Sequence, residues 1–197
     1  MGSENISVEV TLVTLKILVA GHFNAGKTTF VKNASENLPL LTEKQTSSER
    51  ERNLKPKTTV AMDFSSIREE NFEVKIFGIP GQDRFSFMWE ILSRNTHGFI
   101  FLIDSTREDM WDDTIVQMRV MLKGESIPFI VCANKQDLPE AKEISYIRHR
   151  MKNLYGIEEI YPCVATDKEV VKQLISILIQ KIMESLDRET PVQEGTT

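Results

Sequence analysis

One segment constrains the fold of this chain more than any other: residues 21–28 read GHFNAGKT. The segment matches the pattern GxxxxGK[ST], and it lies between a continuous apolar run, residues 15–20, and a helical stretch. Glycines let such a loop curl so that several backbone N–H groups point inward, and the helix start adds the positive end of its dipole. Lys27 would reach the outer phosphates, and the Thr28 hydroxyl would ligate magnesium. The segment therefore predicts a nucleoside triphosphate site.

The rest of the chain alternates apolar strand-like runs with amphipathic helical ones. The last helical run, residues 168–186, opens with the capping-box pattern Thr166-x-x-Glu169. The alternation predicts an α/β domain with a mostly parallel, six-stranded sheet flanked by helices on both faces. The six strand candidates are residues 15–20, 58–67, 72–79, 98–104, 128–133 and 160–165.

The 197 residues are enough for one domain, which we place at residues 15–186. Residues 1–14 are expected to form a strand-like extension, because apolar and polar residues alternate there. Residues 187–197 are polar, contain Pro191 and are expected to be disordered. Residues 38–57 form a long polar segment that predicts a functional or mobile loop.

Composition excludes several functional classes. Against 24 Lys and Arg there are 29 Asp and Glu, and the net charge of -5 argues against nucleic-acid binding. No apolar run approaches the roughly 20 residues that cross a bilayer, and no signal peptide is evident. Neither a prenylation cysteine nor a myristoylation pattern is present, since Ile6 occupies the position that needs Ser or Thr. Cys132 and Cys163 are predicted to be reduced core thiols. We expect a cytoplasmic protein without a direct membrane anchor.

A second motif, Asn134-Lys135-Gln136-Asp137, follows the predicted strand that ends at Ala133. Ligands of α/β sheets bind at the carboxyl ends of strands, where this motif is expected. The Asp137 carboxylate can accept both N–H groups on the guanine edge, a pattern that adenine does not offer. Taken alone, the motif is also consistent with a solvated polar turn, but its order after the phosphate loop favours a guanine site.

With both motifs in place, residues 15–186 resemble the Ras superfamily of small GTPases. The loop segment AGKTT, residues 25–29, is more similar to the Arf and Gα version than to the Ras version. Residues 58–64 and 77–85 resemble most the MglA-like and related archaeal and bacterial predicted GTPases. The resemblance implies a P-loop NTPase of the small G-domain type, a molecular switch that binds GTP or GDP and hydrolyses GTP with Mg²⁺. It also implies effectors or activating proteins that bind through two switch segments.

The resemblance assigns roles residue by residue. Thr59 would be the switch threonine on magnesium, with the adjacent Thr58 as an alternative, and Gly81 would donate its N–H to the γ-phosphate. Gln82 would orient the attacking water while Lys27 neutralises charge, and without an activating partner hydrolysis is expected to be slow, on the order of 10⁻⁴ to 10⁻² per second. The expected nucleotide contacts are Gly21, His22, Phe23, Asn24, Ala25, Gly26, Lys27, Thr28, Thr29, Thr59, Gly81, Asn134, Lys135, Asp137, Ala165 and Thr166, with Thr28 and Thr59 also on the metal.

One departure from the Ras pattern bears on the metal. Ras-type proteins carry an aspartate where this chain has Gly78, and that aspartate holds a magnesium-bound water. Asp63, on the neighbouring predicted strand, is a candidate replacement. Strand alternation favours the opposite interpretation, because Met62 and Phe64 would face inward with Ile76 and turn Asp63 outward. A shift of one residue in register would reverse this assignment.

Several side chains near the predicted site are each consistent with two roles. Phe23 would either obstruct an arginine supplied by an activating partner or fold onto the switch loops, while the neighbouring His22 is expected to point away from the phosphates. The basic residues at 50–55 would either supply an intrinsic arginine finger or form a solvated loop. Phe87 and Trp89 are equally consistent with core positions and with a partner-binding patch. Gly78 and Phe23 together leave a second function open: a GTP-dependent interaction or assembly subunit with negligible hydrolysis.

Overall fold

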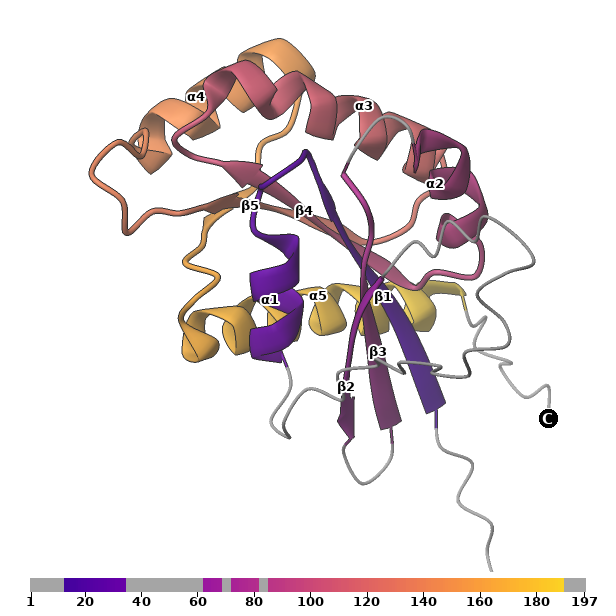
Figure 1. Ribbon diagram of the computed structural model, residues 1–197. Coiled ribbons are helices and arrows are strands. Elements are labelled where there is room, and N and C mark those ends of the chain that lie inside the picture. Colours follow the sequence, from indigo (N-terminus) through magenta and orange to yellow (C-terminus); the bar gives the residue numbers. More distant parts are fainter. Residues whose placement is uncertain (1–12, 35–61, 69–71, 82–84, 190–197) are drawn as a thin grey trace, which may run out of the picture.

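A computed structural model describes residues 13–34, 62–68, 72–81 and 85–189 (Figure 1). They form one six-stranded sheet with the order β2-β3-β1-β4-β5-β6. Every neighbouring pair of strands is parallel except β2 and β3, which are antiparallel. The strands are β1 (Val13–Gly21), β2 (Asp63–Arg68), β3 (Phe72–Gly78), β4 (Gly98–Asp104), β5 (Phe129–Asn134) and β6 (Ile160–Pro162).

Helices cover both faces of this sheet, as predicted (Figure 1). Helices α1 and α5 pack on one face, and α2, α3 and α4 pack on the other. The helices are α1 (Lys27–Ala34), α2 (Ser86–Ser93), α3 (Trp111–Leu122), α4 (Ile144–Tyr155) and α5 (Lys168–Glu189), with a 3₁₀ turn, η2 (Glu108–Met110), before α3.

The central strands supply side chains to both hydrophobic cores. Along β1, Ile17 and Val19 face α1 and α5, whereas Leu18 and Ala20 face α2, α3 and α4. Every residue of β4 is buried. A strand buried on both faces has no polar side, which is why these segments read as continuous apolar runs.

Several boundaries differ from those predicted. Strand β1 begins at Val13, before the expected boundary at residue 15, and α5 continues to Glu189 instead of ending near residue 186. Strand β6 ends at Pro162, short of the expected residue 165. The capping box is wrong by one residue: the Asp167 carboxylate, and not the Thr166 hydroxyl, accepts the amides of Glu169 and Val170 in the first turn of α5. The other predicted features of residues 1–12, 38–57 and 190–197 lie outside the described residues.

Within the described ranges, no helix is long and apolar enough to cross a membrane.

Candidate functional site

The predicted site residues gather at one edge of the sheet. Strands β1, β3, β4, β5 and β6 run parallel, so the loops that follow them emerge at the same end. We call residues 21–28 the phosphate loop and residues 134–137 the base loop. The two loops and the segment after β6 are joined by hydrogen bonds described below, so the structure brings the two sequence motifs together.

The backbone of the phosphate loop requires glycine at two positions. Gly21 has a φ of 145°, and a Cβ atom there would lie 2.3 Å from the Leu102 carbonyl oxygen. Gly26 has a φ of 101°, and its Cβ would lie 2.2 Å from the Asn134 side-chain nitrogen. Both conformations are ones that residues with side chains rarely adopt. The loop therefore curls tightly against β4 on one side and the base loop on the other.

Lys27 lies inside this curl. Its Nζ donates hydrogen bonds to the carbonyl oxygens of Gly21, at 2.7 Å, and of His22, at 2.6 Å. Burial lowers the pKa of Lys27 to about 8, and the nearby Asp63 carboxylate opposes this effect. A desolvated cation whose protein partners are mainly neutral carbonyls favours an incoming anion, because the anion would stabilise its charged form.

The segment after β3 lies directly against the loop. A Cβ atom on Gly81 would lie 2.4 Å from the Gly21 carbonyl oxygen and 2.5 Å from Lys27 Nζ. The buried Trp89 of α2 donates its indole N–H to the carbonyl oxygen of Pro80, at 3.2 Å, and fixes the residue before Gly81. The structure therefore puts Gly81 beside Lys27, and the resemblance implies that Gly81 contacts the γ-phosphate. Gln82, Thr58, Thr59 and the basic residues at 50–55 lie outside the described residues.

Asp63 occupies the space that Gly78 leaves free. The two residues are direct partners in the β2–β3 ladder, and a Cβ atom on Gly78 would lie 3.1 Å from Asp63 Cβ and 3.3 Å from Asp63 Oδ2. The same Oδ2 accepts a hydrogen bond from the Thr28 hydroxyl at 2.5 Å. The carboxylate on β2 thus lies beside the position from which a side chain on residue 78 would start, and it contacts the predicted magnesium ligand.

This arrangement corrects the outward orientation that strand alternation favoured for Asp63. The ladder pairs Ser65 with Ile76 and Ile67 with Val74, so the odd-numbered residues of β2 share a face with the buried residues of β3. That face packs against α1. Asp63 therefore faces α1 and the phosphate loop, and the shifted register that the sequence left open is the correct one.

These side chains suit a magnesium ion. A hydroxyl and a carboxylate are hard oxygen donors, and Mg²⁺ in nucleotide sites typically uses one or two protein ligands together with phosphate oxygens and waters. Among the described residues, no cluster of three or more His, Cys, Asp or Glu side chains forms a separate metal cage. Thr28 and Asp63 are thus the oxygen groups of this region that fit a metal held jointly with a nucleotide.

Asn134 joins three parts of the site. Its buried side-chain Nδ2 donates to the Ala25 carbonyl oxygen at 2.8 Å, and its Oδ1 accepts from the Ala165 amide at 2.9 Å. Asn33 of α1 donates to the Ala165 carbonyl oxygen at 2.8 Å. Asn134 therefore connects the phosphate loop to the segment after β6. The Ala165 amide donates to Asn134 here, and the roles of Ala165 and Thr166 as nucleotide contacts stay predictions.

The two charged residues of the base loop differ in exposure. Lys135 donates from Nζ to Oδ2 of the buried Asp104 at 2.5 Å. Burial alone would raise the pKa of Asp104, but hydrogen bonds from Lys135 and Thr106 outweigh it and hold the pKa below its usual value. Asp137 is exposed, so its carboxylate is accessible to a ligand at the edge of the sheet.

The two residues after Gly21 have different environments. The His22 ring is buried: its Nδ1 contacts the Phe23 carbonyl oxygen at 2.8 Å, and its Nε2 contacts the Asp104 amide at 3.1 Å. A neutral ring protonated on Nδ1 satisfies both bonds, and burial lowers the pKa of His22. The ring therefore binds β4 and points away from the phosphate loop's interior, as predicted. Phe23 is 59% exposed at the tip of the loop.

On helix α2, Phe87 and Trp89 differ in exposure, although the sequence is equally consistent with a core or a surface position for each. Trp89 is 3% exposed and belongs to the core, whereas Phe87 is 68% exposed. Ile91, one turn further, is also exposed. Phe87 and Ile91 thus leave apolar surface on the helix that follows Gly81.

Sequence reasoning missed two fully buried polar residues of α3, Thr114 and Gln117. Thr114 Oγ1 accepts the His22 amide at 3.0 Å, and Gln117 Oε1 accepts the Gly21 amide at 2.9 Å. Their spacing of three residues puts them on one face of the helix. That spacing is the signal available in the sequence.

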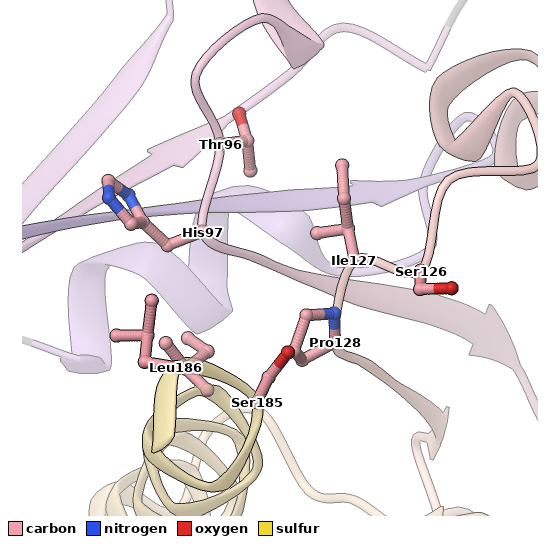
Figure 2. Close-up of a pocket in the computed structure, with 8 residues that line it drawn as sticks. Thr96, His97, Ser126, Ile127, Pro128, Ser185 and Leu186 are labelled. Carbon is pink, nitrogen blue, oxygen red and sulfur yellow. The ribbon is translucent and has the colours of Figure 1, made fainter. Parts of the chain in front are cut away.

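A small depression lies at the opposite end of the strands (Figure 2). It has a volume of about 160 Å³ and is bounded by Thr96 and His97 before β4, Ser126 to Pro128 before β5, and Ser185 and Leu186 of α5. Because it lies at the amino ends of β4 and β5, it is separate from the loops described above.

Known proteins share this sequence pattern and this fold. A model of the ADP-ribosylation factor family matches residues 7–185. Among solved structures, the small GTPase Arl6 (BBS3) of Trypanosoma brucei, with the bound nucleotide analogue GppNp, is similar with a TM-score of 0.66. The sequence identity is 20%, and the alignment covers 87% of this chain and 99% of that chain. The structural likeness supports the fold, and the particular closeness to MglA-like GTPases is not confirmed.

Proposed function

We propose a mechanism from the premise that this chain belongs to the ADP-ribosylation factor family of small GTPases. By that membership the chain is a GTP-binding molecular switch of a GTPase family. The proposal concerns how its own residues perform this function. The observation that carries it is the position of the Asp63 carboxylate, bonded to Thr28 and filling the space beside Gly78.

In this mechanism the phosphate loop binds the phosphates of GTP. The loop amides and the α1 N-terminus supply positive ends of dipoles, and Lys27 supplies the charge that neutralises the outer phosphates. Thr28 would hold Mg²⁺ together with Thr59. Asp63, on β2, would replace the carboxylate that Ras-type proteins carry at the position of Gly78, and would orient the Thr28 hydroxyl toward the metal. Magnesium, when bound, neutralises charge on the β- and γ-phosphates.

Switching and hydrolysis use the two segments that flank β2 and β3. Contacts of the γ-phosphate with Thr59 and with the Gly81 amide hold these segments in one state, and hydrolysis releases them. Gln82 orients the attacking water. The close approach of Gly81 to Lys27 supports this assignment, because a γ-phosphate on Lys27 would lie beside the Gly81 backbone.

Guanine selectivity rests on Asp137, whose exposed carboxylate accepts the N–H groups of the guanine edge. Lys135 and Asn134 support the base loop through their bonds to Asp104, Ala25 and Ala165.

The partners are effector or activating proteins that bind the switch segments. The exposed Phe87 and Ile91 of α2 support such a surface, because apolar side chains next to a nucleotide-dependent segment suit protein contacts. We also propose a cytoplasmic location and no nucleic-acid partner. The two free, buried thiols, Cys132 and Cys163, support a reducing compartment.

A second function, an assembly subunit with negligible hydrolysis, rested on Gly78 and Phe23. The Asp63 carboxylate compensates for Gly78 and so weakens that alternative, whereas the exposed Phe23 leaves it testable.

A single-turnover assay with labelled GTP, with and without Mg²⁺ and with labelled ATP as a control, tests the proposed function. The proposal expects slow cleavage of GTP that requires Mg²⁺ and leaves ATP intact. Tight binding of GTP with cleavage no faster than in buffer would favour the assembly subunit instead, and cleavage of ATP would contradict guanine selectivity.

A further inference from the structure

The start of the phosphate loop is anchored by helix α3. The β1–β4 ladder has its last pair at Gly21 and Leu102, so beyond that pair the backbone groups of the loop need other partners. Thr114 accepts the His22 amide and Gln117 accepts the Gly21 amide, and both side chains are fully buried. Two consecutive amides at the beginning of the loop are therefore bound by two side chains one helical turn apart.

One of these bonds leads directly to Lys27. The Gly21 carbonyl and the His22 amide belong to the same planar peptide unit. The N–H of this unit, on His22, donates to Thr114 Oγ1 at 3.0 Å. The C=O of the same unit, on Gly21, accepts a hydrogen bond from Lys27 Nζ at 2.7 Å. The Gly21–His22 peptide is therefore hydrogen-bonded at both its N–H and its C=O. A rotation of this peptide that breaks the bond to Thr114 also moves the Gly21 oxygen that positions Lys27.

Thr114 is itself held in place from β4. The Thr114 hydroxyl donates onward to the Leu102 carbonyl oxygen at 3.4 Å, and Trp111, at the start of α3, donates its indole N–H to the Asp104 carbonyl oxygen at 2.8 Å. The first turn of α3 is therefore fixed against the end of the strand that flanks the loop.

Packing alone does not explain why a glutamine is buried at position 117; its side-chain oxygen is needed as the acceptor for the Gly21 amide. Among the described side chains, its buried Nε2 has no hydrogen-bond partner, which is an unfavourable state for an amide donor. An apolar residue of similar size would avoid that penalty but would leave the Gly21 amide buried without an acceptor.

We infer that Thr114 and Gln117 are positioning residues of the phosphate loop. Thr114 fixes Lys27 for phosphate binding through the peptide between Gly21 and His22, and Gln117 holds the preceding peptide, between Ala20 and Gly21. The inference rests on the proposed role of the loop in nucleotide binding. Neither side chain is required to touch the nucleotide, because both act through the backbone.

Near-isosteric variants test it. Thr114→Val and Gln117→Met remove the acceptors and are expected to increase the GDP dissociation rate by roughly 5- to 100-fold, since each leaves a buried donor unpaired. Thr114→Ser keeps the hydroxyl and should remain within about threefold of the unmodified protein. Ile115→Val, a buried change on the same helix without a polar group, serves as the packing control.

Hydrogen exchange gives a second readout that tests the contacts independently of nucleotide binding. The His22 amide should lose protection in Thr114→Val and the Gly21 amide in Gln117→Met, while the amides of β4 stay protected. Equal dissociation rates for Thr114→Val and Thr114→Ser, or unchanged protection at Gly21 and His22, would overturn the inference. If the unmodified protein did not bind GDP, the proposed function would fail, and the exchange data would still decide whether α3 anchors the loop.

Discussion

Asp63 and Gly78 are direct partners across the antiparallel β2–β3 ladder, and the Asp63 carboxylate lies next to the position that a Gly78 side chain would take. We propose that the charge that a Ras-type protein carries on β3 is supplied here from β2. Its hydrogen bond with Thr28 connects it to the start of α1, where the phosphate loop ends. If Asp63 has this role, the site can tolerate glycine at a position where Ras-type proteins carry a carboxylate.

Replacing Lys27 by alanine is expected to abolish nucleotide retention. The change removes the positive charge that the structure holds against the carbonyl oxygens of Gly21 and His22 in the phosphate loop. Bound GDP measured after gel filtration is expected to fall to background. Lys32→Ala, an exposed lysine on the same helix, is the matched control and should retain GDP. Retention of GDP by Lys27→Ala would refute the assignment of the phosphate loop.

Asp137→Asn is expected to shift preference from guanine to xanthine nucleotides. Xanthine carries a carbonyl where guanine carries its amino group, so a side-chain amide that donates a hydrogen bond suits it better than a carboxylate. Competition between GDP and xanthosine diphosphate measures the shift, which is expected to exceed tenfold in relative affinity, the effect of about 1.4 kcal/mol. Glu140→Gln, a nearby exposed carboxylate, should leave the preference unchanged. Unaltered selectivity for guanine in Asp137→Asn would count against this role.

His22 predicts a pH dependence of stability. Burial lowers its pKa below the usual 6.5 in the folded protein, so above about pH 6.5 the ring is neutral in both folded and unfolded chains and contributes no pH dependence. As the pH falls below that value, the unfolded chain takes up a proton first. The free energy of unfolding therefore decreases until the folded-state pKa is reached.

Urea denaturation between pH 5 and about pH 8 measures this effect against two variants. His22→Asn should remove the part of the pH dependence that belongs to this ring, whereas His149→Asn, at an exposed histidine, should keep it. Identical pH profiles for the unmodified protein and His22→Asn would show that His22 does not titrate as the buried geometry implies.

The sequence predicted those parts of the molecule that depend on short, local patterns. The phosphate loop, the base loop and the six strands follow from motif spacing and from apolar runs, and five of the strands lie within three residues of the expected bounds. The second strand, expected at residues 58–67, is β2 at Asp63–Arg68, and residues 58–61 lie outside the described residues. Membership of the ADP-ribosylation factor family agrees with the Arf-like loop at residues 25–29.

The features that the sequence did not predict depend on how two segments of the chain pack against each other. Asp63 faces α1 because β2 pairs with β3 in one particular register, and alternation within β2 alone is compatible with either face. From the sequence alone, Thr114 and Gln117 look like polar residues on a solvated helix face. Only the structure shows that they pack against the end of β1 and bind its amides. Asp167 replaces Thr166 as the cap of α5 because a helix start shifts by one residue without changing the pattern.

Moving the carboxylate across the ladder tests its role in the metal site most directly. Asp63→Gly, Gly78→Asp and the double variant are compared by the dissociation rate of GDP over a range of Mg²⁺ concentrations. Asp63→Gly should weaken the stabilisation by Mg²⁺ by roughly 10- to 100-fold, as expected when a group that orients a metal ligand is removed. Gly78→Asp alone should crowd Asp63, because its Cβ would lie 3.1 Å from Asp63 Cβ. The double variant is expected to recover most of the Mg²⁺ dependence lost in Asp63→Gly. Mg²⁺ dependence that is unchanged in Asp63→Gly would contradict a role for this carboxylate at the metal.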